Sequence, residues 1–279
     1  MTDTPRRRRS ALYLPASNDR AIAKARTLAC DVVILDLEDS VAPEAKEAAR
    51  AQAVTALALG DFGDRELVVR INALDTEWAA ADLAALAEAP PHAILLPKVN
   101  GPADLAACAA LLPGDVALWA MIETPAALLA LGQIAAAPRL AALVMGINDL
   151  AKDMGMQPGS DRLPFHSFLA TTVAAARAHG LGALDGVFNG IDDAQGLVAE
   201  CAQGRRFGFD GKTLIHPSQI AACNSAFSPG TAEIAEAEAI RDAFALPEHA
   251  GKGAIRLDGR MVERLHLAQA LRVLATVGR

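Results

Sequence analysis

Residues 31–71 read DVVILDLEDS VAPEAKEAAR AQAVTALALG DFGDRELVVR I. Two short apolar runs, 32–37 and 67–71, flank an Ala- and Leu-rich stretch with helical periodicity over 44–59. Apolar, β-branched runs without polar alternation are typical of strands that are buried on both faces of a parallel sheet. A helix between two such strands is the usual parallel crossover. Residues 31–71 are therefore predicted to form a β-α-β unit.

The same alternation continues in both directions along the chain. Further strands are predicted at 11–14, 93–96, 116–122, 142–145, 183–187 and, more weakly, 206–209. Further helices are predicted at 20–29, 78–88, 103–111, 126–136, 165–179 and 192–203. No G-x-G-x-x-G follows the first strand, which disfavours an open dinucleotide-binding sheet. Eight units in roughly 220 residues favour a closed TIM (β/α)8 barrel.

The predicted organisation has three parts. Residues 1–9 form a basic arm, in which Arg6 to Arg9 are expected to be solvated. Residues 10–217 form the barrel. Residues 218–279 form a C-terminal helical extension, with helices at 218–226 and 232–245, a Gly-rich break at 251–253 and an amphipathic tail over 261–277. This extension is surplus to the barrel and is expected to form a lid or to pack on another subunit.

Composition excludes several classes of protein. The chain has 279 residues, is 52% hydrophobic and carries a net charge of −7. So apolar a chain can bury a large core, yet it has no apolar run long enough to span a membrane, and its acidic balance does not suit nucleic acid. The four cysteines, Cys30, Cys108, Cys201 and Cys223, form no C-x-x-C motif. We expect reduced thiols and a cytoplasmic location.

Charged residues collect where the predicted strands end, which is where TIM barrels carry their active sites. These strand-end residues are Asp36, Glu38, Asp39, Arg70, Lys98, Glu123, Asp149, Asp185, Asp210 and Lys212. Asp39, Asp185 and Asp210 are equally well explained as turn residues. Lys98 and Lys212 are poor candidates for a Schiff base, because the surrounding acids would raise the pKa of each ammonium.

Glu123 and Asp149 end neighbouring strands, with no His or Cys at either position. Two carboxylates completed by water and substrate suit Mg²⁺, whereas zinc would favour His or Cys ligands. Arg70 faces the same end of the barrel and offers a charged fork for a carboxylate or an enolate oxygen. The alternative for Arg70 is a structural one, in which it neutralises Asp36 or Glu38.

Taken together, the strand-end motifs resemble a known family. They are R-S-x-L-Y-L-P at 9–15, D-V-V-I-L-D-L-E-D-S-V at 31–41, V-R-I-N-A-L-D at 69–75, L-P-K at 96–98, M-I-E-T-P at 121–125, G-I-N-D-L-A at 146–151 and G-F-D-G-K-T-L-I-H-P-S-Q-I at 208–220. In this order they resemble the citrate lyase beta subunit-like branch of the HpcH/HpaI aldolase family, which includes malyl-CoA and citramalyl-CoA lyases.

The resemblance implies a TIM barrel with a C-terminal lid and one Mg²⁺ per subunit, held by Glu123 and Asp149. Arg70 and Glu123 would contact the substrate, with Asp36 as a further catalytic residue beside Arg70. Coenzyme A, as part of the substrate, would be contacted by Ser17, Asn18, Lys24 and Lys46. The resemblance also implies a homo-oligomer, either a trimer or a dimer of trimers.

The lid sequence departs from the family pattern. Family members carry an Asp in a motif like M-V-D-x-P, which acts as general acid/base in the neighbouring subunit, whereas this chain reads M-V-E-R-L at 261–265. Glu263 is expected to take this role. An apolar stripe at helical spacing is expected to pack across the subunit boundary or, alternatively, within the subunit; it comprises Met261, Leu265, Ala268, Leu271 and Leu274.

The resulting functional prediction is a Mg²⁺-dependent carbon-carbon lyase. It would cleave a 3-hydroxyacyl-CoA of the malyl, citramalyl or citryl type to an acyl-CoA and a 2-oxo acid, or catalyse the reverse reaction. Three alternatives remain open: a citrate lyase beta subunit that works with an acyl carrier protein, a CoA-independent 2-oxo acid aldolase, and a non-catalytic protein that binds CoA esters. I-E-T-P and G-I-N-D, in place of I-E-S-P and G-A-E-D, favour a stand-alone enzyme over the subunit.

Overall fold

The computed structural model describes residues 6–157, 159 and 161–276. The chain forms two compact units, and the boundary between them along the sequence falls between Phe227 and Ser228. The boundary expected from the sequence, between residues 217 and 218, lies earlier. The difference arises because α10 (Ile220–Ala226) packs against α9 (Ala194–Phe207) and the barrel strands of the first unit.

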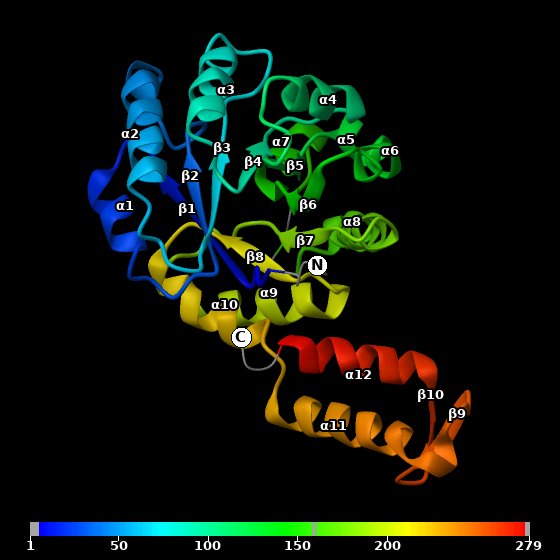
Figure 1. The fold of residues 1–279 in the computed structure, drawn as a ribbon. Coiled ribbons are helices and arrows are strands. Elements are labelled where there is room, and N and C mark those ends of the chain that lie inside the picture. Colours follow the sequence, from blue (N-terminus) through cyan, green and yellow to red (C-terminus); the bar gives the residue numbers. More distant parts are fainter. Residues whose placement is uncertain (1–5, 158, 160, 277–279) are drawn as a thin grey trace. The chain divides into compact units, whose positions relative to one another are not determined.

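The first unit is a closed parallel barrel, which confirms the predicted TIM-barrel fold (Figure 1). Among the described residues its strands are β1 (Ser10–Pro15), β2 (Val32–Asp36), β3 (Glu66–Arg70), β4 (Ala93–Leu96), β5 (Ala117–Ile122), β6 (Leu140–Met145), β7 (Gly182–Asp185) and β8 (Gly211–Leu214). Each strand pairs with the next, and β1 pairs with β8 in the register Ala11 to Thr213. The carboxyl ends of all the strands therefore open at one end of the barrel.

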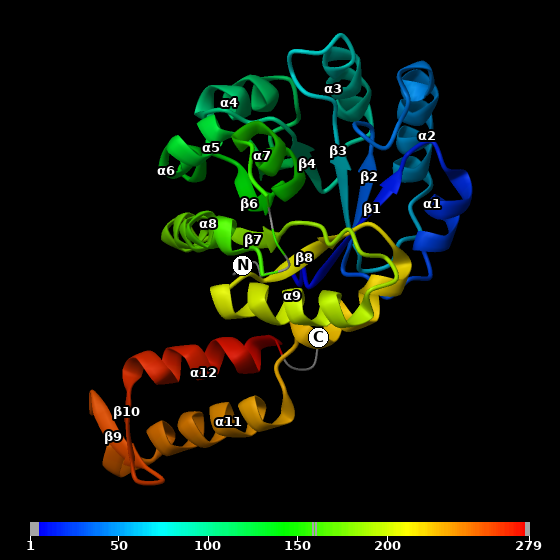
Figure 2. The ribbon, with the colours of Figure 1, turned by 180° about the vertical axis from the view of Figure 1, so that it is seen from behind.

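Helices cover the outside of the barrel in both views (Figures 1 and 2). In addition to α9 and α10 they are α1 (Asp19–Ala25), α2 (Lys46–Leu59), α3 (Ala79–Glu88), α4 (Pro102–Ala110), α5 (Pro125–Leu129), α6 (Leu131–Ala135), α7 (Ile147–Met154) and α8 (His166–Ala178). Short 3-10 turns occur at η1 (Pro43–Ala45), η2 (Leu163–Phe165) and η3 (Pro217–Gln219).

Both faces of the sheet are buried, which explains why the strands read as continuous apolar runs. In β2, Val32 and Ile34 belong to the cluster that fills the barrel interior together with Trp119. Val33 and Leu35 belong to the cluster between the sheet and the helices. The side chains of a strand thus alternate between two apolar layers. Polar residues are found where the strands end, and the candidate site lies there.

The prediction for the eighth strand was wrong. The predicted segment, 206–209, includes the end of α9 at Phe207 and its C-cap Gly208, which has a left-handed φ of 96°. The strand is Gly211–Leu214, which has Lys212 and Thr213 at its centre. Polarity hid this strand, because a fully buried Lys212 is tolerated only through its ion pairs with Asp185 and Glu200.

Arg8 and Arg9 of the N-terminal arm are folded against the barrel, in contrast to the solvated arm that was expected, whereas Arg6 is exposed as expected. Residues 1–5 lie outside the described residues. Arg8 pairs with Glu66 at 2.7 Å and lies 4.8 Å from the ring centroid of Trp119. Arg9 pairs with Asp31, also at 2.7 Å. Glu66 begins β3, so the arm closes the amino-terminal end of the barrel.

The second unit has a small core of its own. It consists of α11 (Thr231–Ala245), η4 (Pro247–His249), the hairpin β9 (Ala254–Leu257) and β10 (Arg260–Glu263), and α12 (Arg264–Thr276). Ile240, Ile255, Val262 and Ala270 pack together at its centre. The barrel and this unit differ in how well the sequence predicts them, because the hairpin was not anticipated.

The tail was predicted as one helical stripe over 261–277, and this was wrong for its first part. Met261 and Glu263 lie in β10, and Val277 lies outside the described residues. Within α12, Leu267 and Ala270 pack against the unit's core, whereas Leu265 is exposed. Of the predicted stripe, Leu274 packs against this core, whereas Leu265 and Leu271 are exposed, so the inward face of the helix differs from the predicted stripe.

Two smaller expectations concern cysteines and membranes. All four cysteines are free and buried, in agreement with the expected reduced thiols. None of the helices in the described part of the chain combines the length and the apolar character that crossing a membrane would need.

Candidate active site

Glu123 is the most deeply buried acid of the site, with no solvent exposure. It follows β5 directly, and Thr124 and Pro125 begin α5 immediately after it, with the Thr124 hydroxyl accepting a hydrogen bond from the backbone N–H of Ala127. Its Oε1 accepts the backbone N–H of Lys98 at 2.7 Å. Its Oε2 is buried and has no hydrogen-bond partner in the described part of the chain. Burial raises the pKa of Glu123, although the nearby Lys98 charge acts against this.

Asp149 is brought to Glu123 by a helix that the sequence reading did not anticipate. It lies in the first turn of α7, with its side chain 28% exposed. Lys98 links the two acids: its Nζ is 2.7 Å from Asp149 Oδ1 and 3.6 Å from Glu123 Oε1. Burial alone would lower the pKa of Lys98, but Asp149 and Glu123 raise it. This agrees with the expectation that Lys98 is a poor Schiff-base amine.

Gly146 permits the approach of α7 to Glu123. A Cβ at this position would lie 2.3 Å from Glu123 Cβ and 2.6 Å from its Oε2. Only a residue without a side chain fits there, because real Cβ contacts are not this short. The glycine of the G-I-N-D motif therefore shapes the space between the two carboxylates.

Arg70 lies beside these acids at the end of β3. Its Nε and Nη2 donate to the two oxygens of Asp36, each at 2.7 Å. Its Nη1 is 2.8 Å from Glu38 and 3.3 Å from Asp39, and the guanidinium stacks 4.9 Å from the Tyr13 ring centroid. Burial alone would lower the pKa of Arg70, but Asp36 raises it, so Arg70 is charged.

The two interpretations of Arg70 are thus combined in its geometry. The paired donors Nε and Nη2 neutralise Asp36, and Nη1 points to the buried Glu38 and the exposed Asp39. Asp36 also accepts hydrogen bonds from Ser40 and the backbone N–H of Glu38. These contacts make Asp36 a residue that orients Arg70.

Glu38 and Tyr13 belong to the same cluster and were not selected as site residues from the sequence. Burial raises the pKa of Glu38 to about 8, against the opposing effect of Arg70. Burial also raises the pKa of Tyr13, whose hydroxyl lies 3.9 Å from Met121 Sδ. Glu38 was listed from the sequence only as a strand-end charge and a possible partner of Arg70, and a tyrosine inside a strand carries no signal that separates it from core residues.

The donor set fits Mg²⁺. Glu123 contributes a buried, unpartnered carboxylate oxygen, and Asp149 contributes a partly exposed carboxylate. In the part of the chain that the structure describes, no cluster of three His, Cys, Asp or Glu side chains is arranged to hold a metal. A hard cation that keeps water or substrate oxygens in its other positions is compatible with such a two-carboxylate site.

The sequence profile of the HpcH/HpaI aldolase/citrate lyase family matches residues 9–217. The chain belongs to this family. A (3S)-malyl-CoA thioesterase of Cereibacter sphaeroides strain KD131 is 51% identical over 267 residues, covering 96% of this chain and 93% of that protein. An L-malyl-CoA/beta-methylmalyl-CoA lyase of C. sphaeroides strain ATCC 17025 is 35% identical over 294 residues, covering 94% and 92%.

Solved structures of the HpcH/HpaI family support the same assignment. Protein CitE from Mycobacterium tuberculosis, in complex with magnesium, acetoacetate and coenzyme A, superposes with a TM-score of 0.81 at 32% identity. The match covers 97% of this chain and 98% of that one. Magnesium and coenzyme A, the expected cofactor and substrate group, are thus both bound by a relative that matches the whole chain.

The four expected coenzyme A contacts of this family member differ in their surroundings. Ser17 and Lys24 are exposed, and Asn18 caps α1 by accepting the N–H of Ala21. Lys46 is buried. Its ammonium donates to the backbone carbonyls of Leu37 and Glu38, both at 2.7 Å. Lys46 therefore supports the loop after β2, and its contact with coenzyme A stays a prediction.

Glu263 lies at the end of β10 in the second unit and is partly buried. Its backbone N–H donates to His266 Nδ1 at 2.9 Å. A strand end, in place of the expected helix start, positions this carboxyl. Its role as general acid/base in the barrel of a neighbouring subunit stays a prediction.

Asp185 and Asp210 are explained by structural ion pairs. Asp185 is fully buried between Lys212 and Arg162, at 3.1 and 2.8 Å. Asp210 pairs with Arg177 at 2.7 Å and accepts the backbone N–H of Ala183. The contacts of Asp185 and Asp210 are therefore those of structural residues.

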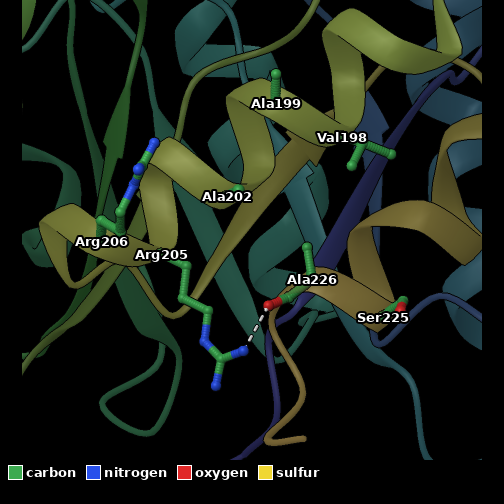
Figure 3. Close-up of a pocket in the computed structure, with 7 residues that line it drawn as sticks. All are labelled: Val198, Ala199, Ala202, Arg205, Arg206, Ser225 and Ala226. Carbon is green, nitrogen blue, oxygen red and sulfur yellow. Dashed lines mark hydrogen bonds between the residues drawn. The ribbon is translucent and has the colours of Figure 1, made fainter.

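A groove between α9 and α10 lies apart from these residues (Figure 3). It is lined by Val198, Ala199, Ala202, Arg205, Arg206, Ser225 and Ala226. Arg205 donates to the carbonyl of Ala226 at 3.1 Å. None of the expected site residues is among those that line it.

Proposed function

We propose that this protein is a Mg²⁺-dependent enzyme that cleaves or forms the carbon-carbon bond of a 3-hydroxyacyl-CoA. The observation that carries this proposal is the buried, unpartnered carboxylate oxygen of Glu123, which faces the Gly146 turn. The Glu123 carboxyl also interacts electrostatically with Asp149 and Arg70. The family membership and the magnesium and coenzyme A in the M. tuberculosis relative support it.

Glu123 and Asp149 would hold the metal. When bound, Mg²⁺ would supply a Lewis acid that stabilises negative charge on oxygen. Arg70 would stabilise the thioester enolate through the Nη1 edge, which the enolate would share with Glu38 and Asp39, because Nε and Nη2 are fixed on Asp36. A cation held in place before the reaction needs no reorganisation as charge develops, and such stabilisation is commonly the largest contribution to catalysis.

The second unit has a place in this proposal. Glu263 would act as general acid/base in the barrel of a neighbouring subunit, so the active protein would be a homo-oligomer, either a trimer or a dimer of trimers. The free thiols fit a reducing, cytoplasmic location.

A second candidate is hydrolysis of the thioester of the same substrate class. The observation that favours it is the 51% identity, over nearly the whole chain, to a (3S)-malyl-CoA thioesterase. The same Arg70 and metal carboxylates would stabilise charge on the thioester oxygen. The two activities differ in the bond that breaks, and the products separate them.

The test is to incubate the purified protein with (3S)-malyl-CoA and Mg²⁺ and follow both sets of products. Carbon-carbon cleavage gives acetyl-CoA and glyoxylate without a free thiol, whereas hydrolysis gives malate and the free thiol of coenzyme A. Citramalyl-CoA and citryl-CoA extend the panel, and Glu123→Gln is the inactive control. Hydrolysis without glyoxylate would contradict the lyase proposal, and absence of both reactions across the panel would favour a binding protein.

A further inference from the structure

Lys98 has an unusual backbone conformation for a lysine. It follows β4 and Pro97 with a φ of 52°, in the left-handed region that residues with a side chain rarely adopt. This conformation directs its N–H to Glu123 Oε1 at 2.7 Å. The backbone of Lys98 thus fixes one oxygen of Glu123 and leaves Oε2 without a partner.

The side chain of Lys98 contacts the same pair of acids from the other direction. Its ammonium is 2.7 Å from Asp149 Oδ1 and 3.6 Å from Glu123 Oε1, and the side chain is about one-third exposed. One residue therefore bridges both carboxylates, through its N–H and through its charge. The exposure leaves the ammonium free to turn toward solvent.

A divalent cation bound by these carboxylates would lie about 2.1 Å from their oxygens. An ammonium at 2.7 Å from Asp149 would then be within a few ångströms of the ion, where like charges repel strongly in a partly buried site. The two cations compete for the same negative charge. The N–H contact to Glu123 carries no net charge and is compatible with either cation.

We propose that the Lys98 ammonium is an internal competitor of the divalent cation: it holds Glu123 and Asp149 together and is displaced from Asp149 when the metal binds. The consequence is a metal affinity below that of the bare carboxylate pair. This inference rests on the Glu123 and Asp149 metal site of the proposed function.

The first test is Mn²⁺ binding, measured by electron paramagnetic resonance or calorimetry. Lys98→Met is expected to bind Mn²⁺ about fivefold more tightly than the wild type, the size of effect that a partly exposed ion pair produces. Lys152→Met is the matched control, because Lys152 is an exposed lysine on the same helix as Asp149. Equal or weaker binding by Lys98→Met would overturn the competitor role.

Two further variants make this test unambiguous. Lys98→Gly removes the ammonium and adopts a positive φ freely, so it replaces Lys98→Met if that variant fails to fold. Glu123→Gln with Asp149→Asn is expected to lose Mn²⁺ binding. If this double variant bound like the wild type, the metal site itself would be wrong, whereas loss here with no gain in Lys98→Met overturns only the competitor role.

The second test follows the ammonium directly. Reductive methylation of lysines, quantified by peptide mass spectrometry, is expected to modify Lys98 several-fold faster when Mg²⁺ is added, with Lys152 unchanged. Faster modification would show that the metal frees the ammonium from Asp149. An unchanged or slower rate at Lys98 would overturn the inference, because a lysine that stays on Asp149 beside the metal would remain protected.

Discussion

At the scale of single residues, Gly146 offers the sharpest test of the site. Gly146→Ala is expected to weaken Mn²⁺ binding at least about tenfold, because the new Cβ would lie 2.3 Å from Glu123 Cβ and must displace that side chain. Gly132→Ala is the control, since a Cβ there meets no atom within 4 Å. Titration with Mn²⁺, together with far-UV circular dichroism, measures both. Wild-type affinity in Gly146→Ala would show that Glu123 is not held by this contact.

A second residue-scale prediction concerns Arg70→Lys. Turnover is expected to fall about a hundredfold although the charge is kept, because a lysine cannot bind both oxygens of Asp36 and also present a third donor. Steady-state kinetics measure the loss. Arg50→Lys, which alters the Arg50 to Asp82 pair on α2 and α3, serves as the comparison. Near-normal turnover in Arg70→Lys would assign Arg70 a purely structural role.

The sequence predicted the principal residues of the candidate site because strand ends in a parallel barrel converge on one mouth. Glu123 interacts electrostatically with both Asp149 and Arg70, whereas the bridging role of Lys98 and the membership of Glu38 did not emerge from the sequence. The role of Lys98 depends on its positive φ and that of Glu38 on the direction of its side chain, and neither property is encoded in apolar periodicity. The burial of Lys46 on the carbonyls of Leu37 and Glu38 was likewise not evident from the sequence.

At the scale of elements, the contact of β7, β8 and α9 depends on a buried charge cluster. Asp185→Asn is expected to lower the free energy of unfolding by about 3 kcal/mol, because it leaves Lys212 and Arg162 buried with an incomplete set of partners. Asp210→Asn should cost below about 1 kcal/mol, since its pair with Arg177 is half exposed. Urea unfolding at pH 7 measures both, and equal costs would contradict the burial argument.

The pH dependence of stability follows from the direction in which the pKa of Asp185 is shifted. Although burial alone would raise the pKa of Asp185, Lys212 and Arg162 lower it below its ordinary value of 3.8. The stabilisation is therefore complete above that value and is lost as the pH falls through the lowered pKa. Asp185→Asn is expected to flatten the acid limb of the stability curve. If this variant kept the wild-type acid limb, Asp185 would not be the group that causes the loss of stability at low pH.

Helices and strands could be predicted where their buried residues follow the apolar pattern of the sequence. The first seven barrel strands coincide with apolar runs, and the parallel order follows from the helices between them. The failures share one cause, which is that tertiary contacts override local composition. Gly211–Leu214 is polar yet forms a strand because α9 supplies Glu200, and Arg260–Glu263 is helical in spacing yet pairs with β9.

At the scale of the whole molecule, the proposal of a shared site makes a quantitative prediction. Inactive Arg70→Ala and inactive Glu263→Gln are mixed under conditions that exchange subunits. Random assembly would give about a quarter of the sites both an intact Arg70 and a neighbour's intact Glu263. Activity after mixing, followed against exchange measured by native mass spectrometry, is therefore expected to rise toward a quarter of the wild-type value.

The control for this experiment mixes Arg70→Ala with Glu123→Gln, two defects that lie in the same barrel. No activity should return, because every barrel then carries one of them. Recovery in the control, or none in the first mixture despite complete exchange, would contradict delivery of Glu263 across a subunit boundary.

The closure of the barrel by Arg8, with Trp119 above it, has a kinetic meaning for such an enzyme. The Trp119 cluster also fills the barrel interior, so reactants and products pass through the strand-end mouth alone, where Asp39 is exposed and Glu123 is innermost. A small acid bound at Glu123 would enter before the bulky thioester and leave after it. We expect ordered release with the 2-oxo acid last, so product-inhibition patterns should show this acid competing for the free enzyme.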